Sequence, residues 1–134
     1  MRRPFHYEDA SLDRSLSAIV TGAGSGLGRA TQDALLERGY RVTAVDCGFG
    51  PACPEHDGLV RETVDVASAE DAEAVVQRHV ARWKAPNVLV NCAGIAAPGA
   101  TLRPDGPMSL DEFRHVLEVN TVGTYNYLRL AARA

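Results

Sequence analysis

Residues 21–28, with the sequence TGAGSGLG, decide the fold, because they place four glycines between a short apolar run and a helical pattern. Residues 18–20 are uniformly apolar and predict a buried strand. From residue 27 to residue 35, apolar side chains recur at the spacing of one helix face. Glycines in such a turn let backbone amides approach an anion at the start of a helix. The stretch therefore predicts a strand–turn–helix unit that holds a phosphate, and the alternative is a tight turn with no ligand.

The alternation of strands and helices continues along the chain. Helices are predicted to start at Ser68 and Ser109, because each has an acidic residue three positions later. Residues 48–58 and 96–108 are rich in glycine and proline and predict loops. Three further apolar runs, each of which predicts a strand, are residues 42–45, 60–66 and 88–90. This order favours an α/β fold with a parallel sheet and right-handed crossovers, over residues 16–134, preceded by an N-terminal arm at 1–15.

Composition narrows the classes of function. The chain has 134 residues, of which 46% are hydrophobic and 23% charged, which is typical of one globular domain. The net charge of −3 argues against a nucleic acid or an anionic membrane as the main partner. No apolar run reaches the roughly 18 residues that a membrane-spanning helix needs. The three cysteines, an odd number without CxxC spacing, indicate free thiols rather than a zinc site. We expect a cytoplasmic protein, with a mitochondrial address left open.

Acidic residues end two of the predicted strands. Asp46 follows the second strand, where a carboxylate accepts hydrogen bonds from both hydroxyls of an adenosine ribose and repels a 2′-phosphate. No arginine or lysine lies within 22–28 or 47–54, so the sequence favours NAD over NADP. Asp65 and Val66 close the third strand, where they are placed to contact an adenine ring. The alternatives are an ordinary surface acid at Asp46 and a turn-forming acid at Asp65.

Small residues and one amide complete the set of candidates. Asn91-Cys92-Ala93-Gly94 ends the fourth strand and leaves space for a ribose or for a crossing helix. Cys92 is interpreted as a buried, inert thiol. Asn120 is predicted to lie on the apolar face of the last helix, with Phe113 and Leu128, where a buried amide needs hydrogen-bond partners. Taken alone, Asn120 reads as a structural residue.

Together these residues resemble the N-terminal part of a short-chain dehydrogenase/reductase. The stretch 21–28 is similar to that family's TGxxxGxG motif, residues 91–94 to its NNAG motif with Cys92 in place of the second Asn, and Asn120 to the Asn of its catalytic tetrad. The resemblance implies NAD and a doubly wound Rossmann sheet, of which this chain supplies strands in the order 3-2-1-4. The cofactor-binding residues that it implies are Gly22, Ser25, Gly26, Leu27, Gly28, Asp46, Asp65, Val66, Asn91, Cys92, Ala93 and Gly94.

Residues 91–96 and 109–120 are also similar to type-2 3-hydroxyacyl-CoA dehydrogenases, which implies hydride transfer between NAD and a secondary alcohol, a ketone or an acyl-CoA substrate. The family's catalytic Ser and Tyr-x-x-x-Lys are absent, and Tyr125 with Arg129 is a false match because arginine does not replace that lysine. We therefore expect the chain to bind part of NAD and to catalyse little by itself. The alternatives are a non-catalytic dinucleotide-binding subunit and a fragment without function. An exposed fourth strand favours a homo-oligomer or completion by another chain.

Overall fold

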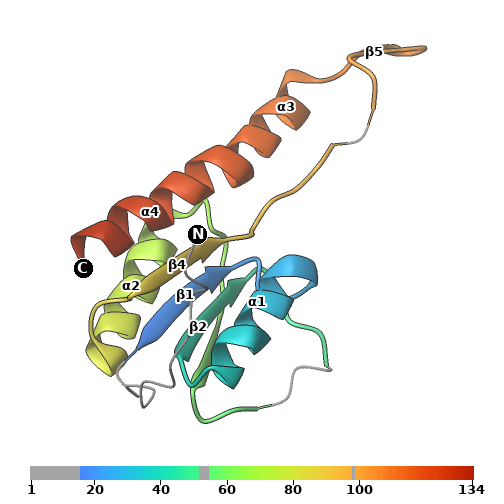
Figure 1. Cartoon of the computed structure of the whole chain (residues 1–134). Helices are drawn as coiled ribbons and strands as arrows, with labels where there is room; N and C mark the ends of the chain where they lie inside the picture. Colours follow the sequence, from blue (N-terminus) through green and yellow to red (C-terminus); the bar gives the residue numbers. More distant parts are fainter. Residues whose placement is uncertain (1–15, 52–54, 98) are drawn as a thin grey trace, which may run out of the picture.

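The structure, a computed structural model, describes residues 16–51, 55–97 and 99–134, so the predicted arm at 1–15 lies outside the described residues. Four strands form one sheet in the order β3-β2-β1-β4, and every neighbouring pair is parallel. The strands are β1 (Ser17–Thr21), β2 (Arg41–Asp46), β3 (Leu59–Thr63) and β4 (Val88–Asn91). The predicted α/β class and the order 3-2-1-4 are both confirmed (Figure 1).

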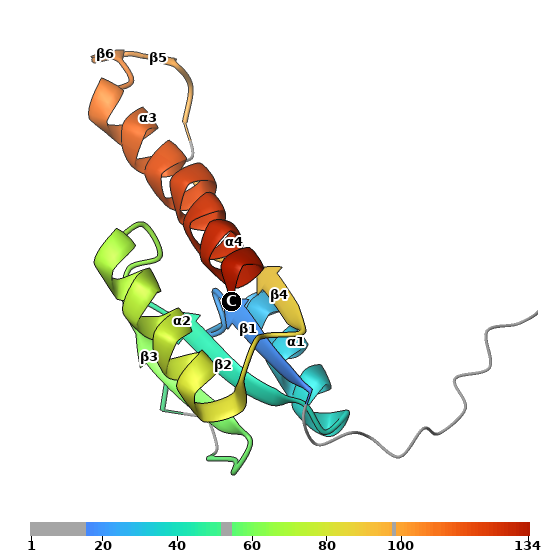
Figure 2. The same ribbon diagram turned by 90° about the vertical axis from the view of Figure 1, so that its left-hand side faces the viewer.

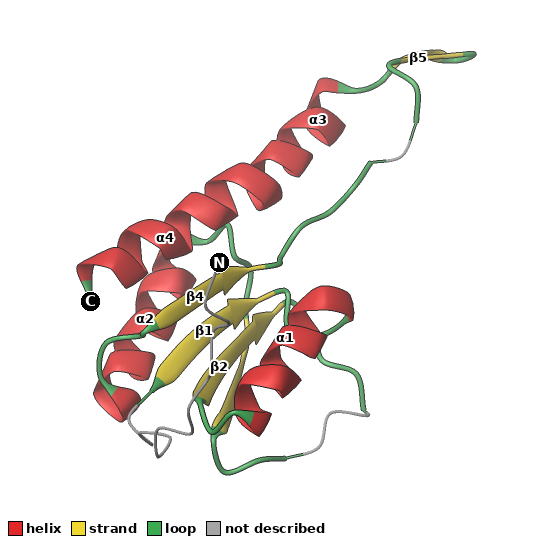
Figure 3. Ribbon diagram, in the orientation of Figure 1, coloured by secondary structure: helices red, strands yellow, loops and turns green. Residues whose placement is uncertain are grey.

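Helices cover both faces of the sheet (Figure 3). The helices that pack on it are α1 (Gly26–Glu37), α2 (Ala69–Trp83) and α4 (Thr124–Arg133). Because successive side chains of a strand point to opposite faces, Ile19 belongs to the core under α2 and α4, while Val20 belongs to the core under α1. All five residues of β1 are buried, which explains the uniformly apolar run in the sequence.

Both predicted serine caps are present. The Ser68 hydroxyl accepts a hydrogen bond from the Asp71 amide at 3.2 Å at the start of α2. Ser109 forms a full capping box with Glu112 at the start of α3 (Leu110–Leu117), since each side chain bonds the other's backbone amide. The caps therefore fix both helix starts as the sequence predicts.

The last helix is longer and less regular than its sequence pattern suggests. A π-helical segment, η1 (Glu118–Gly123), joins α3 to α4, and α3 projects beyond the sheet (Figures 1 and 2). The wider π turn shifts the buried face, so Tyr127 and Leu130 are buried while Phe113 and Leu128 are 53% and 52% exposed. The prediction that Phe113 and Leu128 share a buried face with Asn120 is therefore wrong, and Asn120 itself is exposed.

Two predicted boundaries also differ from the structure. Strand β3 ends at Thr63 rather than at residue 66, so Asp65 and Val66 lie in the turn after it. The turn forms because the Asp65 carboxylate accepts a hydrogen bond from the Ala67 amide at 2.9 Å. The predicted loop at 96–108 contains a short antiparallel ladder of β5 (Leu102–Arg103) and β6 (Gly106–Pro107). Within the described ranges, no helix is both long enough and apolar enough to cross a bilayer.

A histidine lies in the core between the sheet and α2. The His79 ring is 2% exposed, and its Nε2 and Nδ1 atoms lie 3.0 Å and 2.7 Å from the hydroxyls of Ser17 and Thr43. Its ring meets that of Trp83 edge to face, with centroids 5.6 Å apart. Burial lowers the pKa of His79 to about 4, so the imidazole is neutral at pH 7. His79 is therefore a buried residue of the core.

Candidate functional site

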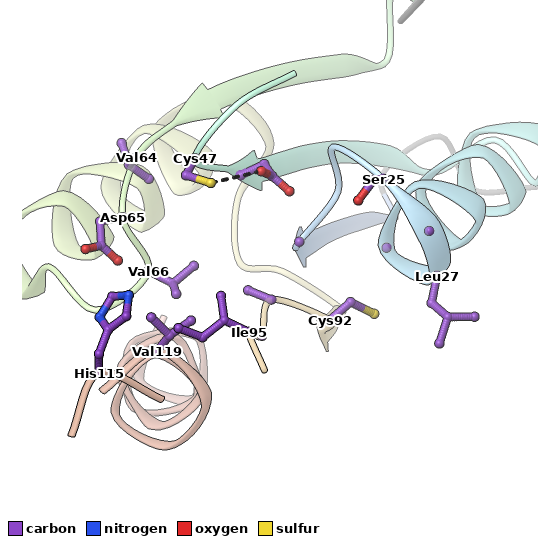
Figure 4. Close-up of a pocket in the computed structure, with 16 residues that line it drawn as sticks. Ser25, Leu27, Cys47, Val64, Asp65, Val66, Cys92, Ile95, His115 and Val119 are labelled. Atoms are coloured by element: carbon purple, nitrogen blue, oxygen red, sulfur yellow. Dashed lines mark hydrogen bonds between the residues drawn. The ribbon is translucent and has the colours of Figure 1, made fainter. Parts of the chain in front are cut away.

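A crevice of about 590 Å³ opens at the carboxyl ends of the four parallel strands. This is the edge at which ligands bind in open parallel sheets, because the loops that follow the strands converge there. Residues from the turn after β1, the ends of β2, β3 and β4, and the helix that starts with α3 line it (Figure 4). The predicted cofactor-binding residues that line it are Gly22, Ser25, Gly26, Leu27, Gly28, Asp46, Asp65, Val66, Cys92, Ala93 and Gly94.

The glycine turn brings two loops of this crevice into contact. Gly22 has a φ of +68°, and a Cβ atom at this position would lie 2.5 Å from the Ala93 amide nitrogen. A Cβ at Gly28 would collide with the backbone of Gly22, which lies at the other end of the turn. These positions therefore admit only glycine if the helix is to start this close to the sheet.

The start of α1 is open to an anion. Ser25 occupies the N-cap position, but its side chain makes no capping hydrogen bond, and the first turn holds no acidic residue. The amides of this turn therefore keep the partial positive charge of a helix N-terminus. Leu27, in the same turn, is 82% exposed beside the crevice (Figure 4).

Asp46 closes the crevice opposite this helix start. Its Oδ2 accepts a hydrogen bond from the Gly24 amide at 2.8 Å, and its Oδ1 accepts one from the Gly48 amide at 3.1 Å. The Oδ2 atom keeps a further acceptor position for a ligand hydroxyl. The Cys47 thiol also donates to Asp46, at 3.5 Å, and the carboxylate raises the pKa of that thiol, so Cys47 stays protonated at neutral pH.

The turn after β3 forms a wall of the crevice and is held from behind by α4. The buried Asn126 amide donates to the carbonyl oxygens of Val66 and Ser68 at 3.1 Å and 3.0 Å. Gly123 approaches Val66 so closely that a Cβ there would lie 2.7 Å from its side chain. Val66 is thereby buried as a flat apolar surface, while Asp65 remains exposed at the rim.

The turn after β4 is tied to β1 through Thr21. The Thr21 hydroxyl donates to Asn91 at 3.4 Å and accepts a hydrogen bond from the Ala93 amide at 3.2 Å. Asn91 therefore lies behind the wall of the crevice rather than in it, whereas Cys92 lines the crevice and is only half-buried. The prediction of a buried Cys92 is wrong, because the small residues on either side leave its position partly open.

Asn120 meets the same turn from the opposite side. Its Oδ1 accepts a hydrogen bond from the Ile95 amide at 2.8 Å, and its Nδ2 donates to the Ile95 carbonyl at 2.9 Å. Asn120 does not itself line the crevice, but it fixes the strand-like segment that does. Its partners are found, as expected for a structural amide, although the residue is exposed rather than buried.

Sequence reasoning missed several residues of the crevice. His115 and Val119 reach it from α3 and η1, and Val64 and Ile95 complete its apolar lining. His115 and Val119 are one helical turn apart, and this spacing indicates that they share one face of the helix. Nothing in the sequence shows that α3 lies over the turn after β3.

The residues present fit a dinucleotide. The crevice offers an uncapped helix start without acidic residues for a diphosphate, a carboxylate with a remaining acceptor position for a ribose, and an apolar wall for a base. The glycine turn gives the close backbone approach that a diphosphate needs.

Comparisons with known proteins agree with this geometry. The family described as short chain dehydrogenase matches residues 17–134. The chain is 36% identical over 121 residues to a 3-hydroxyacyl-CoA dehydrogenase type-2 of Drosophila melanogaster, covering 86% of this chain and 48% of that protein. The human 3-hydroxyacyl-CoA dehydrogenase type-2 is 34% identical over 125 residues, covering 89% and 48%. The chain therefore spans about half the length of the curated relatives that it matches.

Solved structures agree as well. The ligand-free aldohexose dehydrogenase of Thermoplasma acidophilum superposes with a TM-score of 0.75 at 28% identity, over 88% of this chain and 43% of that one. A short chain dehydrogenase of Leptospira borgpetersenii with bound NAD+ gives a TM-score of 0.78 at 21% identity, over 88% and 45%, which supports the fold. The match over residues 17–134, on a parallel sheet of this order, shows that the chain belongs to the short-chain dehydrogenase family.

Proposed function

We propose that the chain is the cofactor-binding part of an NAD-dependent oxidoreductase that transfers hydride between NAD and a secondary alcohol or ketone. The observation that carries the proposal is the position of Asp46, whose carboxylate lines the crevice opposite the glycine turn. The carboxylate accepts hydrogen bonds from the Gly24 and Gly48 amides, and its Oδ2 keeps a further acceptor position at the crevice that a ribose hydroxyl would fill.

Each part of the dinucleotide has a matching part of the crevice in this proposal. The amides at the start of α1 hold the diphosphate, with Ser25 beside it. Asp46 accepts the hydroxyls of the adenosine ribose, and the adenine ring lies against Val66 with its polar edge toward Asp65. The turn at 92–94 lies under the second ribose, because its small side chains leave room there.

The preference for NAD over NADP follows from charge. The carboxylate of Asp46 repels a 2′-phosphate at the position that the ribose would occupy. The crevice includes neither an arginine nor a lysine among the described residues that line it. A bound 2′-phosphate would therefore lack a cationic partner and face a negative charge.

The proposed chemistry is hydride transfer at the nicotinamide ring, which NAD supplies when bound. The chain's own residues bind and orient, and Asn120 acts by holding the turn at Ile95. The sequence contains a single lysine, Lys84, and no Tyr-x-x-x-Lys, so we expect turnover to need residues outside these 134. The similarity to 3-hydroxyacyl-CoA dehydrogenases supports a 3-hydroxyacyl-CoA as substrate.

A second candidate is a non-catalytic dinucleotide-binding subunit. Two features of the described residues support it, namely the apolar side chains that α3 exposes and the β4 edge of the sheet, which has no neighbouring strand there. In both versions we propose that the chain self-associates or is completed by another chain. The free thiols of Cys47 and Cys92 favour a reducing compartment such as the cytoplasm.

Calorimetric titration of the chain with NAD and NADP tests the binding proposal. We expect NAD to bind more tightly, and Asp46→Ala to weaken NAD by about tenfold or more while removing the discrimination against NADP, because charge-assisted hydrogen bonds are lost. Asp105→Asn, in the β5–β6 hairpin away from the crevice, is the matched control and binds like wild type. A folded chain that binds neither nucleotide contradicts the proposal.

Turnover separates the two candidates. Absorbance of NADH is followed with 3-hydroxyacyl-CoA and secondary alcohols, using the chain extended by its natural downstream sequence. Turnover in the extended protein supports the oxidoreductase. Tight NAD binding without turnover, together with co-purification of a full-length relative, supports the non-catalytic subunit instead.

A further inference from the structure

We propose that His115 contacts the base of the bound nucleotide and reads its polar edge together with Asp65. The inference rests on the proposed dinucleotide site and adds a residue to it. His115 comes from α3 and Asp65 from the turn after β3, yet both line the same crevice. The imidazole of His115 and the carboxylate of Asp65 point toward one another from these two elements (Figure 4).

Both side chains keep polar atoms for a ligand. Among the described residues, neither ring nitrogen of His115 has a hydrogen-bond partner, and Asp65 uses one carboxylate oxygen to accept from the Ala67 amide. The residues next to them in the crevice are Val66 and Val119, which are apolar. A planar ring lying on these valines would therefore present its edge to an acceptor and to a group that donates or accepts.

The chemistry of this pair fits a 6-aminopurine. The exocyclic amino group of adenine offers two N–H donors, which suit the carboxylate of Asp65, while its neighbouring ring nitrogens are acceptors, which suit an imidazole N–H. A 6-oxopurine such as hypoxanthine turns an oxygen toward Asp65, so the carboxylate disfavours it. His115 supplies the donor that Asp65 lacks, and its loss should lower affinity for the adenine nucleotide.

His115 is a suitable residue to vary because we expect its replacement to leave the fold intact. It is exposed on α3 and belongs to neither core cluster. His115→Leu keeps a side chain of similar size but removes both ring nitrogens, whereas His115→Gln keeps a hydrogen-bond donor and an acceptor. Arg114→Gln, one residue earlier and not part of the crevice, is the matched control.

The test is calorimetric titration of the full 134-residue chain with ADP-ribose and with its hypoxanthine analogue. We expect His115→Leu to bind ADP-ribose about five- to tenfold more weakly, which corresponds to one hydrogen bond, and both His115→Gln and Arg114→Gln to stay within about threefold of wild type. Wild type should prefer ADP-ribose, and Asp65→Asn should narrow that preference. Circular dichroism checks that every variant is folded.

Each contrary outcome has a distinct meaning. If wild type binds ADP-ribose, Asp46→Ala weakens that binding and His115→Leu changes nothing, the role of His115 is overturned while the dinucleotide site stands. If His115→Gln weakens binding as much as His115→Leu, His115 does not act by hydrogen bonding and the inference is wrong. If folded wild type binds no ADP-ribose, the proposed function fails and this inference fails with it.

Discussion

The side chain of Asn120 pairs with the backbone of Ile95 through two hydrogen bonds of 2.8 Å and 2.9 Å, one accepted and one donated. This pair joins the π-helical segment η1 to the turn after β4, two parts of the chain that are 25 residues apart. An ionised carboxylate does not reproduce it, because it has no donor for the Ile95 carbonyl. The pair therefore holds η1, and with it the adjoining helix α3, in a fixed position next to the turn after β4.

Replacing Asn120 tests the strength of this pair. Asn120→Ala removes both hydrogen bonds and should lower the free energy of unfolding by about 1–2 kcal/mol, measured by urea titration. Asn120→Asp keeps the acceptor for the Ile95 amide but faces the Ile95 carbonyl with a negative charge, so it should also destabilise. Thr121→Ala, the next residue on the same exposed segment, is the control. Equal stability of Asn120→Ala and wild type would show that the pair contributes nothing.

Buried His79 predicts how stability depends on pH. Its folded-state pKa of about 4 lies below the ordinary value of 6.5, so the unfolded chain binds more protons between these values. The contribution of neutral His79 is complete above pH 6.5 and is lost as the pH falls toward 4. The loss is of order 3 kcal/mol, and Trp83 fluorescence during urea unfolding reports it.

Two variants distinguish the contribution of His79 to acid sensitivity from that of the other titrating groups. His79→Gln should be less stable at pH 7 and should show a shallower decline from pH 6.5 to 4. His56→Gln, at a loop position that is exposed, should keep the wild-type slope. If the free energy of unfolding falls with pH as steeply in His79→Gln as in wild type, other titrating groups cause the acid sensitivity.

Because the Tyr127 hydroxyl is buried, we expect that its removal does not destabilise the folded protein. Its side chain is fully buried, and its hydroxyl has no hydrogen-bond partner among the described residues. Burial raises the pKa of Tyr127, so the hydroxyl stays protonated and its desolvation is not offset. Tyr127→Phe should leave the free energy of unfolding unchanged or raise it by about 1 kcal/mol. Tyr125→Phe, at a position 63% exposed, is the neutral control, and a clear loss of stability in Tyr127→Phe would reveal a missing partner.

The exposed side of α3 predicts self-association or capture of another chain. Leu110, Phe113 and Leu117 recur at helical spacing and are 58%, 53% and 43% exposed, and the β4 edge of the sheet has no neighbouring strand among the described residues. Sedimentation velocity should show species larger than a monomer at micromolar concentration. The double variant Phe113→Glu with Leu117→Glu should reduce them, whereas Arg114→Glu on the same helix should not. A wild-type chain that sediments as a stable monomer would contradict this prediction.

Local signals in the sequence were sufficient for most of the sheet and for the helix starts. Strands 18–20 and 42–45 were predicted within two residues of their bounds, because buried parallel strands need uniformly apolar runs. Ser68 and Ser109 mark helix starts through side-chain hydrogen bonds to residues three positions away, which depend on no distant contact.

The errors lie where a distant contact decides the structure. Residues 64–66 continue the apolar pattern of β3, but the last bond to β2 runs from the Val64 amide to the Asp46 backbone carbonyl, and the chain then turns at Asp65. Phe113 and Leu128 fit one regular helix face, and the π turn at η1 moves that face, since Asn120 bonds to Ile95 and Gly123 packs on Val66. His115 joins the crevice for the same reason: its place depends on where the whole helix crosses the sheet, which helical spacing does not encode.

The walls of the crevice come from five segments that are separate in the chain, and this makes any nucleotide bound there a cross-link of the fold. Its diphosphate would touch the beginning of α1, its ribose the end of β2, and its base the turn after β3 and the side of α3. A ligand at one hundred times its dissociation constant adds about 2.7 kcal/mol to the free energy of unfolding. The melting temperature of this chain should therefore rise with nucleotide concentration, and the anchoring of its projecting helix should tighten at the same time.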